Sequence, residues 1–302
     1  MKKIPAVCVA VLLLFLTQIF FGQEPGIIAA QGGIVKENLW LESKLLGQNV
    51  NYSIYLPSDY ETSSRRYPTV YLLHGFTDNE TAWIQFGEVN LAADRAIAAR
   101  EIPPMIIVMP DAGITWYIND YANKKPFEDM FFQELIPFID KTYRTRPKKE
   151  FRAVAGLSMG GWGSLVYALK HPSVFAACVP FSAGVYANED IIAMDDGRYD
   201  YVFTTLFGIS LKGTARVNEH WQKYSPMTLM ETLPVDSLKS VRWYIDCGDD
   251  DFLSKGNNLL HILMRERNVP HEFRVRDGAH NWEYWRTGIS DGLKFIGASF
   301  HR

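Results

Sequence analysis

A serine between glycines is the residue of this sequence best suited to nucleophilic chemistry. Gly156-Leu157-Ser158-Met159-Gly160 stands between an apolar run typical of a buried strand and a stretch with helical periodicity. A serine at such a sharp turn adopts a strained backbone and projects its hydroxyl above the sheet. The glycines on either side are needed because a side chain there would collide with the neighbouring strand or helix. The pattern predicts Ser158 as a nucleophile.

A serine hydroxyl needs a base within hydrogen-bond reach. Among the seven histidines, His280 has the most suitable place, because it follows the last predicted strand, at residues 271–275. Gly278 and Ala279 give its loop little bulk, so the imidazole can reach the serine. Chains with this kind of turn order the three groups as serine, acid and histidine. We therefore expect His280 to act as the base.

The acid that orients the imidazole should leave the sheet before His280. The run Asp246-Cys247-Gly248-Asp249-Asp250-Asp251 does so. Asp246 is expected within the strand. Asp251 lies three residues past the glycine and is the preferred acid. Asp250 stays open as the alternative, and a carboxylate without this role would cap the following helix or lie in solvent.

A second loop offers backbone groups for a developing oxyanion. His74-Gly75-Phe76-Thr77-Asp78 follows a predicted buried strand directly. A tetrahedral intermediate needs two N–H groups aimed at its negative oxygen. We expect one from Met159, the residue after the nucleophile, and one from Phe76 in this loop. His74 is expected to brace the loop.

Strands and helices alternate along the chain, which predicts a mostly parallel sheet with helices on both faces and an N-terminal antiparallel hairpin. Strands are predicted at residues 34–46, 49–56, 69–73, 105–109, 151–155, 174–181, 241–247 and 271–275. Helices are predicted at 91–100, 128–143, 159–170, 256–267 and 291–300, with a kink at Pro137 in the second. Residues 183–234 break this rhythm and are expected to form an insertion over the active-site edge of the sheet.

Taken together, these motifs resemble the esterase D and feruloyl esterase group of the α/β hydrolases, to which the mycobacterial mycolyltransferases also belong. The resemblance runs from about residue 39 to the C-terminus, and it rests on five segments: Leu72-Leu73-His74-Gly75, Val108-Met109-Pro110-Asp111, Gly156-Leu157-Ser158-Met159-Gly160-Gly161, Cys247-Gly248-Asp249-Asp250-Asp251 and Gly278-Ala279-His280. It implies an α/β-hydrolase fold that needs no metal or organic cofactor. It also implies a triad of Ser158, Asp251 and His280 and oxyanion amides at Phe76 and Met159. Residues 183–234 match no family pattern, so substrate selection is expected there.

Composition and the N-terminus narrow the class further. The 302 residues carry a net charge of −3 without a basic stripe, which argues against a nucleic-acid partner. Lys2 and Lys3 precede an apolar run over residues 6–16, so residues 1–22 are predicted to be a signal peptide and 23–302 a single domain. An uncleaved anchor is the alternative, and no membrane span is expected after cleavage. Cys178 and Cys247 then remain, and both are expected as buried free thiols.

These expectations point to an exported, periplasmic or secreted serine carboxylesterase. Export favours a polymer ester, and feruloyl or acetyl esters on plant polysaccharide fit best. Trp116, Tyr117, Trp162 and Trp282 are expected to line a stacking wall for the substrate. Acyl transfer of the mycolyltransferase type, hydrolysis of a siderophore or other small acyl ester, and a non-catalytic carbohydrate-binding role remain as alternatives. The sequence does not fix the oligomeric state.

Overall fold

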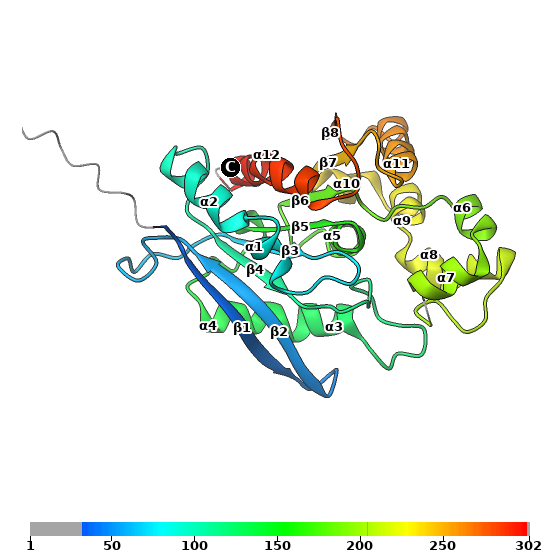
Figure 1. Ribbon diagram of the computed structural model, residues 1–302, viewed down its shortest axis with the longest axis horizontal. Helices are drawn as coiled ribbons and strands as arrows, with labels where there is room; N and C mark the ends of the chain where they lie inside the picture. Colours follow the sequence, from blue (N-terminus) through cyan, green and yellow to red (C-terminus); the bar gives the residue numbers. More distant parts are fainter. Residues whose placement is uncertain (1–31, 204, 301–302) are drawn as a thin grey trace, which may run out of the picture. The chain divides into compact units, whose positions relative to one another are not determined.

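A sheet of eight strands forms the centre of the computed structural model, which describes residues 32–203 and 205–300 (Figure 1). The strands lie in the order β1-β2-β4-β3-β5-β6-β7-β8. Their bounds are β1 (Ile34–Ser43), β2 (Gln48–Leu56), β3 (Thr69–Leu73), β4 (Ile106–Pro110), β5 (Arg152–Leu157), β6 (Ala177–Phe181), β7 (Arg242–Gly248) and β8 (His271–Arg276). The predicted signal peptide, residues 1–22, lies outside the described part of the chain.

The pairing of the strands confirms the predicted topology. β1 pairs antiparallel with β2, and β2 pairs antiparallel with β4. Every pair from β4 to β8 is parallel. The carboxyl ends of β3, β5, β7 and β8 therefore meet along one edge of the sheet, and the loops that follow them carry the predicted site residues.

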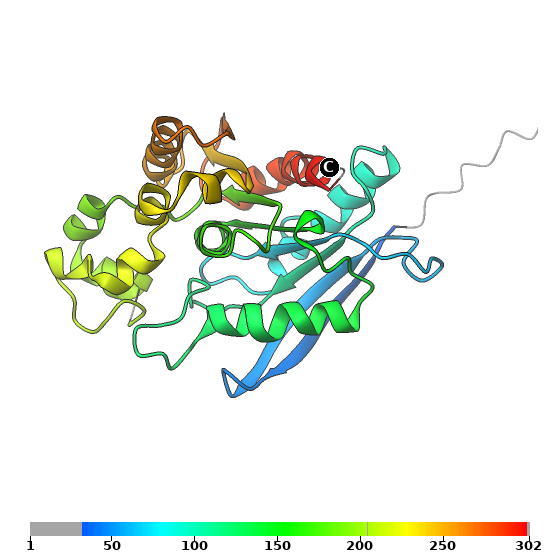
Figure 2. The same ribbon diagram turned by 180° about the vertical axis from the view of Figure 1, so that it is seen from behind.

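Alternate side chains of each central strand enter two different cores. On β3, Tyr71 and Leu73 join the core beneath α4 and α5, whereas Val70 and Leu72 join the core beneath α2 and α12. The two views in Figures 1 and 2 show helices on both faces of the sheet. Such double coverage explains why these strands are apolar throughout.

The helices that surround the sheet confirm most of the predictions. They are α1 (Ala82–Gln85), α2 (Val89–Ala98), α3 (Phe127–Met130), α4 (Ile136–Thr142), α5 (Met159–Lys170), α11 (Ser254–Glu266) and α12 (Trp282–Ser299), with a 3-10 turn at Lys149–Phe151. α12 begins nine residues before the predicted start, because Asn281 caps it by accepting a hydrogen bond from the Tyr284 N–H. Among the described residues no helix is long and apolar enough to cross a bilayer.

Pro137 distorts its helix as its missing N–H requires. The segment between α3 and α4, Phe131–Leu135, is a π-helical turn, and Pro137 follows it in the first turn of α4. The π turn changes the hydrogen-bond register where proline has no donor to offer. Cys178 and Cys247 are both buried free thiols, as predicted.

The chain between β6 and β7 forms a group of short helices. They are α6 (Asn188–Ala193), α7 (Asp196–Phe203), α8 (Glu219–Tyr224), α9 (Pro226–Thr232) and α10 (Val235–Lys239), with a 3-10 turn at Gly213–Arg216. α9 packs against α5 and α11. In Figure 1, α6, α7 and α8 are drawn to the right of α5, on the side away from β1 and β2.

A buried carboxylate ties this helical segment to the main body. Glu128 on α3 accepts hydrogen bonds from Lys170 (2.6 Å), from His171 (2.8 Å) and from the hydroxyl of Tyr224 on α8 (2.9 Å). Burial by itself would raise the pKa of Glu128, but His171 and Lys170 outweigh it and lower the pKa to about 2. The ionised form is therefore part of the folded structure.

Replacing Glu128 by Gln is expected to reduce the free energy of unfolding by roughly 3 kcal/mol at pH 7. The folded pKa lies below the ordinary value of 4.5, so this stabilisation is complete above pH 4.5 and disappears as the pH falls toward 2. Urea unfolding of both proteins at several pH values measures the difference. The exposed Glu231→Gln on α9 serves as control, and a gap between wild type and Glu128→Gln that persists unchanged at pH 3 would contradict the assignment.

Candidate active site

Ser158 lies at the turn between β5 and α5 with a strained backbone, at φ +54° and ψ −115°. A Cβ on Gly156 would come within 2.4 Å of the Gly160 carbonyl oxygen, and one on Gly160 within 2.4 Å of the Leu73 carbonyl oxygen. Both positions therefore require glycine. The close packing of strand, helix and neighbouring loop keeps the Ser158 backbone in this strained conformation. Ser158 itself lies in the wall of a cleft.

A chain of hydrogen bonds joins the three residues singled out in the sequence. His280 Nε2 lies 2.9 Å from Ser158 Oγ, and His280 Nδ1 lies 3.0 and 2.9 Å from the two carboxylate oxygens of Asp251. A carboxylate accepts only, so Nδ1 carries a proton and the lone pair of Nε2 faces the serine. Asp250, the alternative acid, is exposed and has no such contact with His280.

The electrostatics of Asp251 keep it ionised. Burial acts to raise its pKa, but the hydrogen bond and charge of His280 outweigh this effect, aided by Ser182 and by the N–H of Leu253. The pKa of Asp251 consequently lies below its ordinary value. A negative charge at this place holds one tautomer of the imidazole and favours its protonated form during a reaction.

Backbone contacts lock the two loops that carry Asp251 and His280. The Asp250 N–H donates to the Gly278 carbonyl oxygen (3.1 Å), and the Gly278 N–H donates to Asp249 Oδ1 (3.0 Å). The backbones approach so closely that a Cβ on Gly248 would lie 2.0 Å from the Gly278 carbonyl oxygen. Gly278 itself has φ +141°, which favours glycine.

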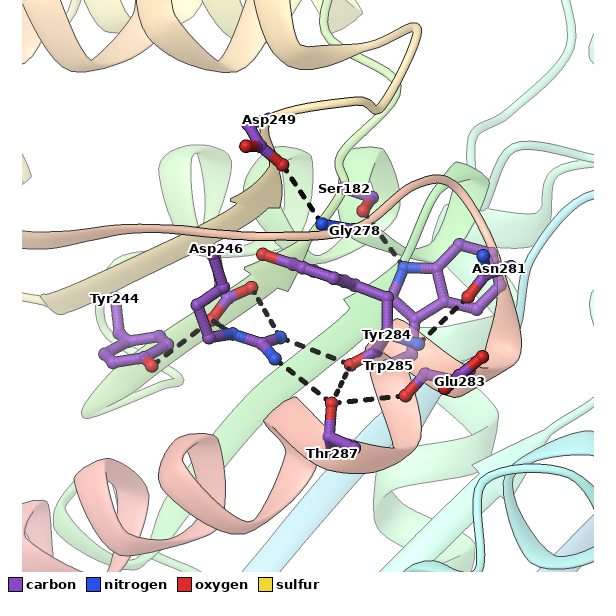
Figure 3. Close-up of polar contacts among 11 residues, drawn as sticks. Ser182, Tyr244, Asp246, Asp249, Gly278, Asn281, Glu283, Tyr284, Trp285 and Thr287 are labelled. Carbon is purple, nitrogen blue, oxygen red and sulfur yellow. Dashed lines mark hydrogen bonds and ion pairs between the residues drawn. The ribbon is translucent and has the colours of Figure 1, made fainter.

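The fully buried Asp246 forms an ion pair with the partly buried Arg276 close to these loops, and Figure 3 draws the hydrogen bonds around Asp246. Asp246 on β7 accepts hydrogen bonds from Arg276 Nε (3.2 Å) and from its terminal nitrogen (3.0 Å). Arg276 also donates to the Tyr284 carbonyl oxygen and to Thr287 Oγ1 on α12. The pair therefore links β7, β8 and the start of α12. The sequence indicated Asp246 only as a strand residue and gave no sign of its partner 30 positions away.

Further contacts fix the sides of the site. Trp285 on α12 donates from its indole nitrogen to Ser182 Oγ at 3.0 Å, directly after β6 (Figure 3). Its ring packs edge-on against His280, with 4.8 Å between centroids. Sequence reasoning had assigned no role to Ser182, because a single serine after a strand carries no distinctive pattern.

The loop after β3 runs beside the serine. A Cβ on Gly75 would lie 3.7 Å from Ser158 Cβ, which shows how closely the loop approaches the serine. Phe76 is the next residue and lines the cleft together with Ser158. Met159 begins α5, and its N–H is among the first-turn donors that have no acceptor within the helix. His74 is buried and braces the loop as expected, since its Nδ1 donates to the Gly75 carbonyl oxygen and its Nε2 accepts from the Ala112 N–H.

The cleft over Ser158 has a volume of about 350 Å³ and a largely aromatic wall. Two of the four predicted wall residues, Trp116 and Trp282, line it. The expectation of a substrate contact is corrected for the other two. Tyr117 is fully buried, where its hydroxyl donates to the His74 carbonyl oxygen, and Trp162 is fully buried between other rings. Further rings in the wall are those of Phe76, Tyr186, Phe252 and Trp285.

One group of carboxylates among the described residues is close enough together to hold a cation, and it consists of Asp249, Asp250 and Asp277. All three are exposed. Asp249 already accepts the N–H groups of Asp250 and Gly278, so its role is to hold the loops together.

Comparison with known proteins gives the family. The profile of the Esterase family matches residues 43–296, which is most of the chain. The chain belongs to this family. A solved structure of a ferulic acid esterase is 34% identical to the chain, with a TM-score of 0.77, and the match covers 89% of this chain and 99% of that one. Together with the strand order, this similarity confirms the α/β-hydrolase fold expected from the sequence.

Two curated relatives are longer proteins. An endo-1,4-beta-xylanase/feruloyl esterase from Xylanibacter ruminicola is 37% identical over 183 residues, which are 57% of this chain and 24% of the relative. An esterase from Mycobacterium tuberculosis is 29% identical over 262 residues, which are 80% of this chain and 55% of the relative. The chain thus spans about a quarter and about half of the length of these two relatives.

Replacing Asp246 by Asn is expected to lower the free energy of unfolding by about 3 kcal/mol, because Arg276 loses its buried partner. Glu272→Gln, which breaks the more exposed pair with Arg274 on the same strand β8, is the matched control and should cost less than about 1 kcal/mol. Urea unfolding at pH 7 measures both values. Equal losses in the free energy of unfolding would show that the Asp246–Arg276 pair stabilises the fold no more than the exposed pair does.

Proposed function

We propose that this protein is an exported serine carboxylesterase that hydrolyses feruloyl or acetyl esters on plant polysaccharide. The observation that carries the proposal is the hydrogen-bonded chain of Ser158, His280 and Asp251, which opens into an aromatic cleft. Membership of the Esterase family supports ester hydrolysis. The two similar proteins named for ferulic acid esters support the acyl group.

Export is part of the same proposal. The two lysines and the apolar run within residues 1–22 have the pattern of a secretory leader. Polysaccharide esters are too large to enter a cell readily, so an enzyme that acts on them needs to be outside the cytoplasm. The periplasm and the medium both meet this requirement.

The geometry suits an acyl-enzyme mechanism. His280 Nε2 takes the proton of Ser158 Oγ as the oxygen attacks the ester carbonyl carbon, and Asp251 stabilises the imidazolium that forms. The carbonyl oxygen becomes negative and receives the N–H groups of Phe76 and Met159. His280 then gives its proton to the leaving alcohol. A water molecule, activated by His280, attacks the acyl-enzyme and releases the acid and the free serine.

The cleft wall supports a planar acyl group. Trp282 and Phe252 present ring surfaces beside Ser158, and the nearly buried Trp116 reaches the same wall. Flat rings stack favourably on such surfaces. A cavity of about 350 Å³ is at the lower end of the range for small-molecule sites. That volume fits a phenolic acid and leaves little space for a long acyl chain.

Asp251→Asn should lower kcat about 10⁴-fold. An amide stabilises the wrong imidazole tautomer, and it has no negative charge to stabilise the imidazolium. Asp250→Asn, one residue earlier and exposed, is the matched control and should keep the wild-type rate. Ser158→Ala should abolish turnover and labelling by a fluorophosphonate probe. Hydrolysis of p-nitrophenyl acetate measures the rates, and circular dichroism confirms folding. A large loss with Asp250→Asn and none with Asp251→Asn would reverse the assignment of the acid.

Rates on methyl ferulate, acetylated xylan and tributyrin should separate the acyl groups. We expect kcat/KM for methyl ferulate to exceed that for tributyrin at least tenfold, because only the phenolic ring can stack in the cleft. Hydrogenation of the ferulate ring provides a matched substrate of similar size without an aromatic face. Equal rates on the two ring forms would remove the feruloyl assignment.

A further inference from the structure

A second cavity of about 390 Å³ adjoins the cleft on the side of the helical segment between β6 and β7. The two cavities share Tyr186, Arg198, Phe252 and Leu253 in their walls. The rest of the second wall comes from the loop after β6, from α6, from the link between α6 and α7, and from the start of α11. Its remaining residues are Val185, Asp190, Ala193, Met194, Asp195, Lys255 and Gly256.

The chemistry of the two walls differs sharply. Around Ser158 the wall is aromatic, with Asp78 and Arg198 as its charged members. The second cavity has four charged side chains, and two of them, Asp190 and Lys255, form an ion pair. A wall with both charged donors and charged acceptors suits a ligand with several hydroxyl groups better than a flat apolar one.

The reaction itself directs the alcohol toward this cavity. His280 gives its proton to the leaving oxygen, so the alcohol of the ester must lie on the His280 side of the serine. The exposed ring of Phe252 packs on His280, with 4.5 Å between centroids, and the same ring forms part of the second wall. An alcohol larger than methanol that extends past His280 on this side would meet Phe252 and, beyond it, the second cavity.

Arg198 is the group best placed to recognise that alcohol. Its guanidinium lies 5.9 Å from the Phe252 ring centre, at the boundary between the two cavities. Its side chain hydrogen-bonds Tyr186, which lines both cavities as well, and within the described part of the chain no carboxylate forms an ion pair with it. The donors that Tyr186 does not use are available for a ligand. A guanidinium offers five N–H groups in a fixed arrangement.

The helix that carries Arg198 is held firmly. The buried Arg216 forms an ion pair with Asp196 at the start of α7 and donates to the carbonyl oxygens of Ile191 and Met194. Arg198 lies in the first turn of α7, where its backbone N–H donates to Asp195 Oδ1 at 3.0 Å. A rigid support reduces the entropy cost of binding through this side chain.

We infer that the second cavity binds the leaving alcohol of the ester, that this alcohol is a sugar residue, and that Arg198 together with the Asp190–Lys255 pair recognises its hydroxyl groups. This inference rests on the proposed function, which already names polysaccharide esters, and adds to it the cavity and the side chains that bind the sugar. It assigns specificity for the sugar to the segment between β6 and β7, whereas Ser158 and its partners act on the ester group.

Two esters with the same acyl group and different alcohols test the inference. Methyl ferulate has no sugar, and feruloyl arabinose places a sugar in the second cavity. In Arg198→Ala we expect the ratio of kcat/KM for feruloyl arabinose to that for methyl ferulate to fall about tenfold, mainly through KM, because a charged donor is lost. Arg65→Ala removes an exposed arginine outside both cavities and should leave the ratio unchanged. An unchanged ratio in Arg198→Ala would overturn the inference.

Binding to the Ser158→Ala protein separates this inference from the esterase proposal. Calorimetry should show tighter binding of feruloyl arabinose than of methyl ferulate, and adding Arg198→Ala should remove most of the difference. If wild-type protein hydrolyses neither ester, the esterase proposal fails, while the binding comparison still decides whether the sugar site exists. Equal affinities for the two esters would overturn the sugar site even if hydrolysis is rapid.

Discussion

The contact between two glycines determines where the partners of Ser158 lie. Gly248 ends β7, Gly278 follows β8, and their backbones approach too closely for any side chain between them. This contact sets the register between the loop that carries Asp251 and the loop that carries His280. The carboxylate and the imidazole therefore meet without needing a substrate to bring them together. In the proposed mechanism, preorganisation of this kind removes a reorganisation cost from each catalytic cycle.

Two buried carboxylates, one in β7 and one in the loop that follows it, have partners of different kinds. Asp246 has a permanently charged partner, Arg276, which holds it in place and links it to α12. Asp251 has a titratable partner, His280, which takes up and returns a proton in the proposed mechanism. The two carboxylates are five positions apart in the sequence, and under this proposal one stabilises the fold and the other serves the reaction. A guanidinium beside Asp251 would hold that carboxylate away from the imidazole.

The sequence predicted the parts of the site that have a local signature. Ser158 is recognisable because its glycines must permit close backbone approach, and His280 because its loop follows the last strand. The acid was harder to select, since four aspartates follow one another closely and only their position in space distinguishes Asp251 from Asp250. The ion pair of Asp246 with Arg276 had no local signature, because its two members come from different strands.

Aromatic residues and the segment between β6 and β7 show where sequence reasoning fails. A cleft wall and a protein core are both apolar, so composition does not distinguish Trp282, which is half-buried and lines the cleft, from Trp162, which is buried between rings. The helices α6 to α10 have five to eight residues each, too few to show a clear periodicity. Their place between adjacent parallel strands nevertheless has an evolutionary consequence. The chain leaves and re-enters the sheet at neighbouring positions, so descendants of one ancestor can exchange this whole stretch for another while inheriting the same reactive centre.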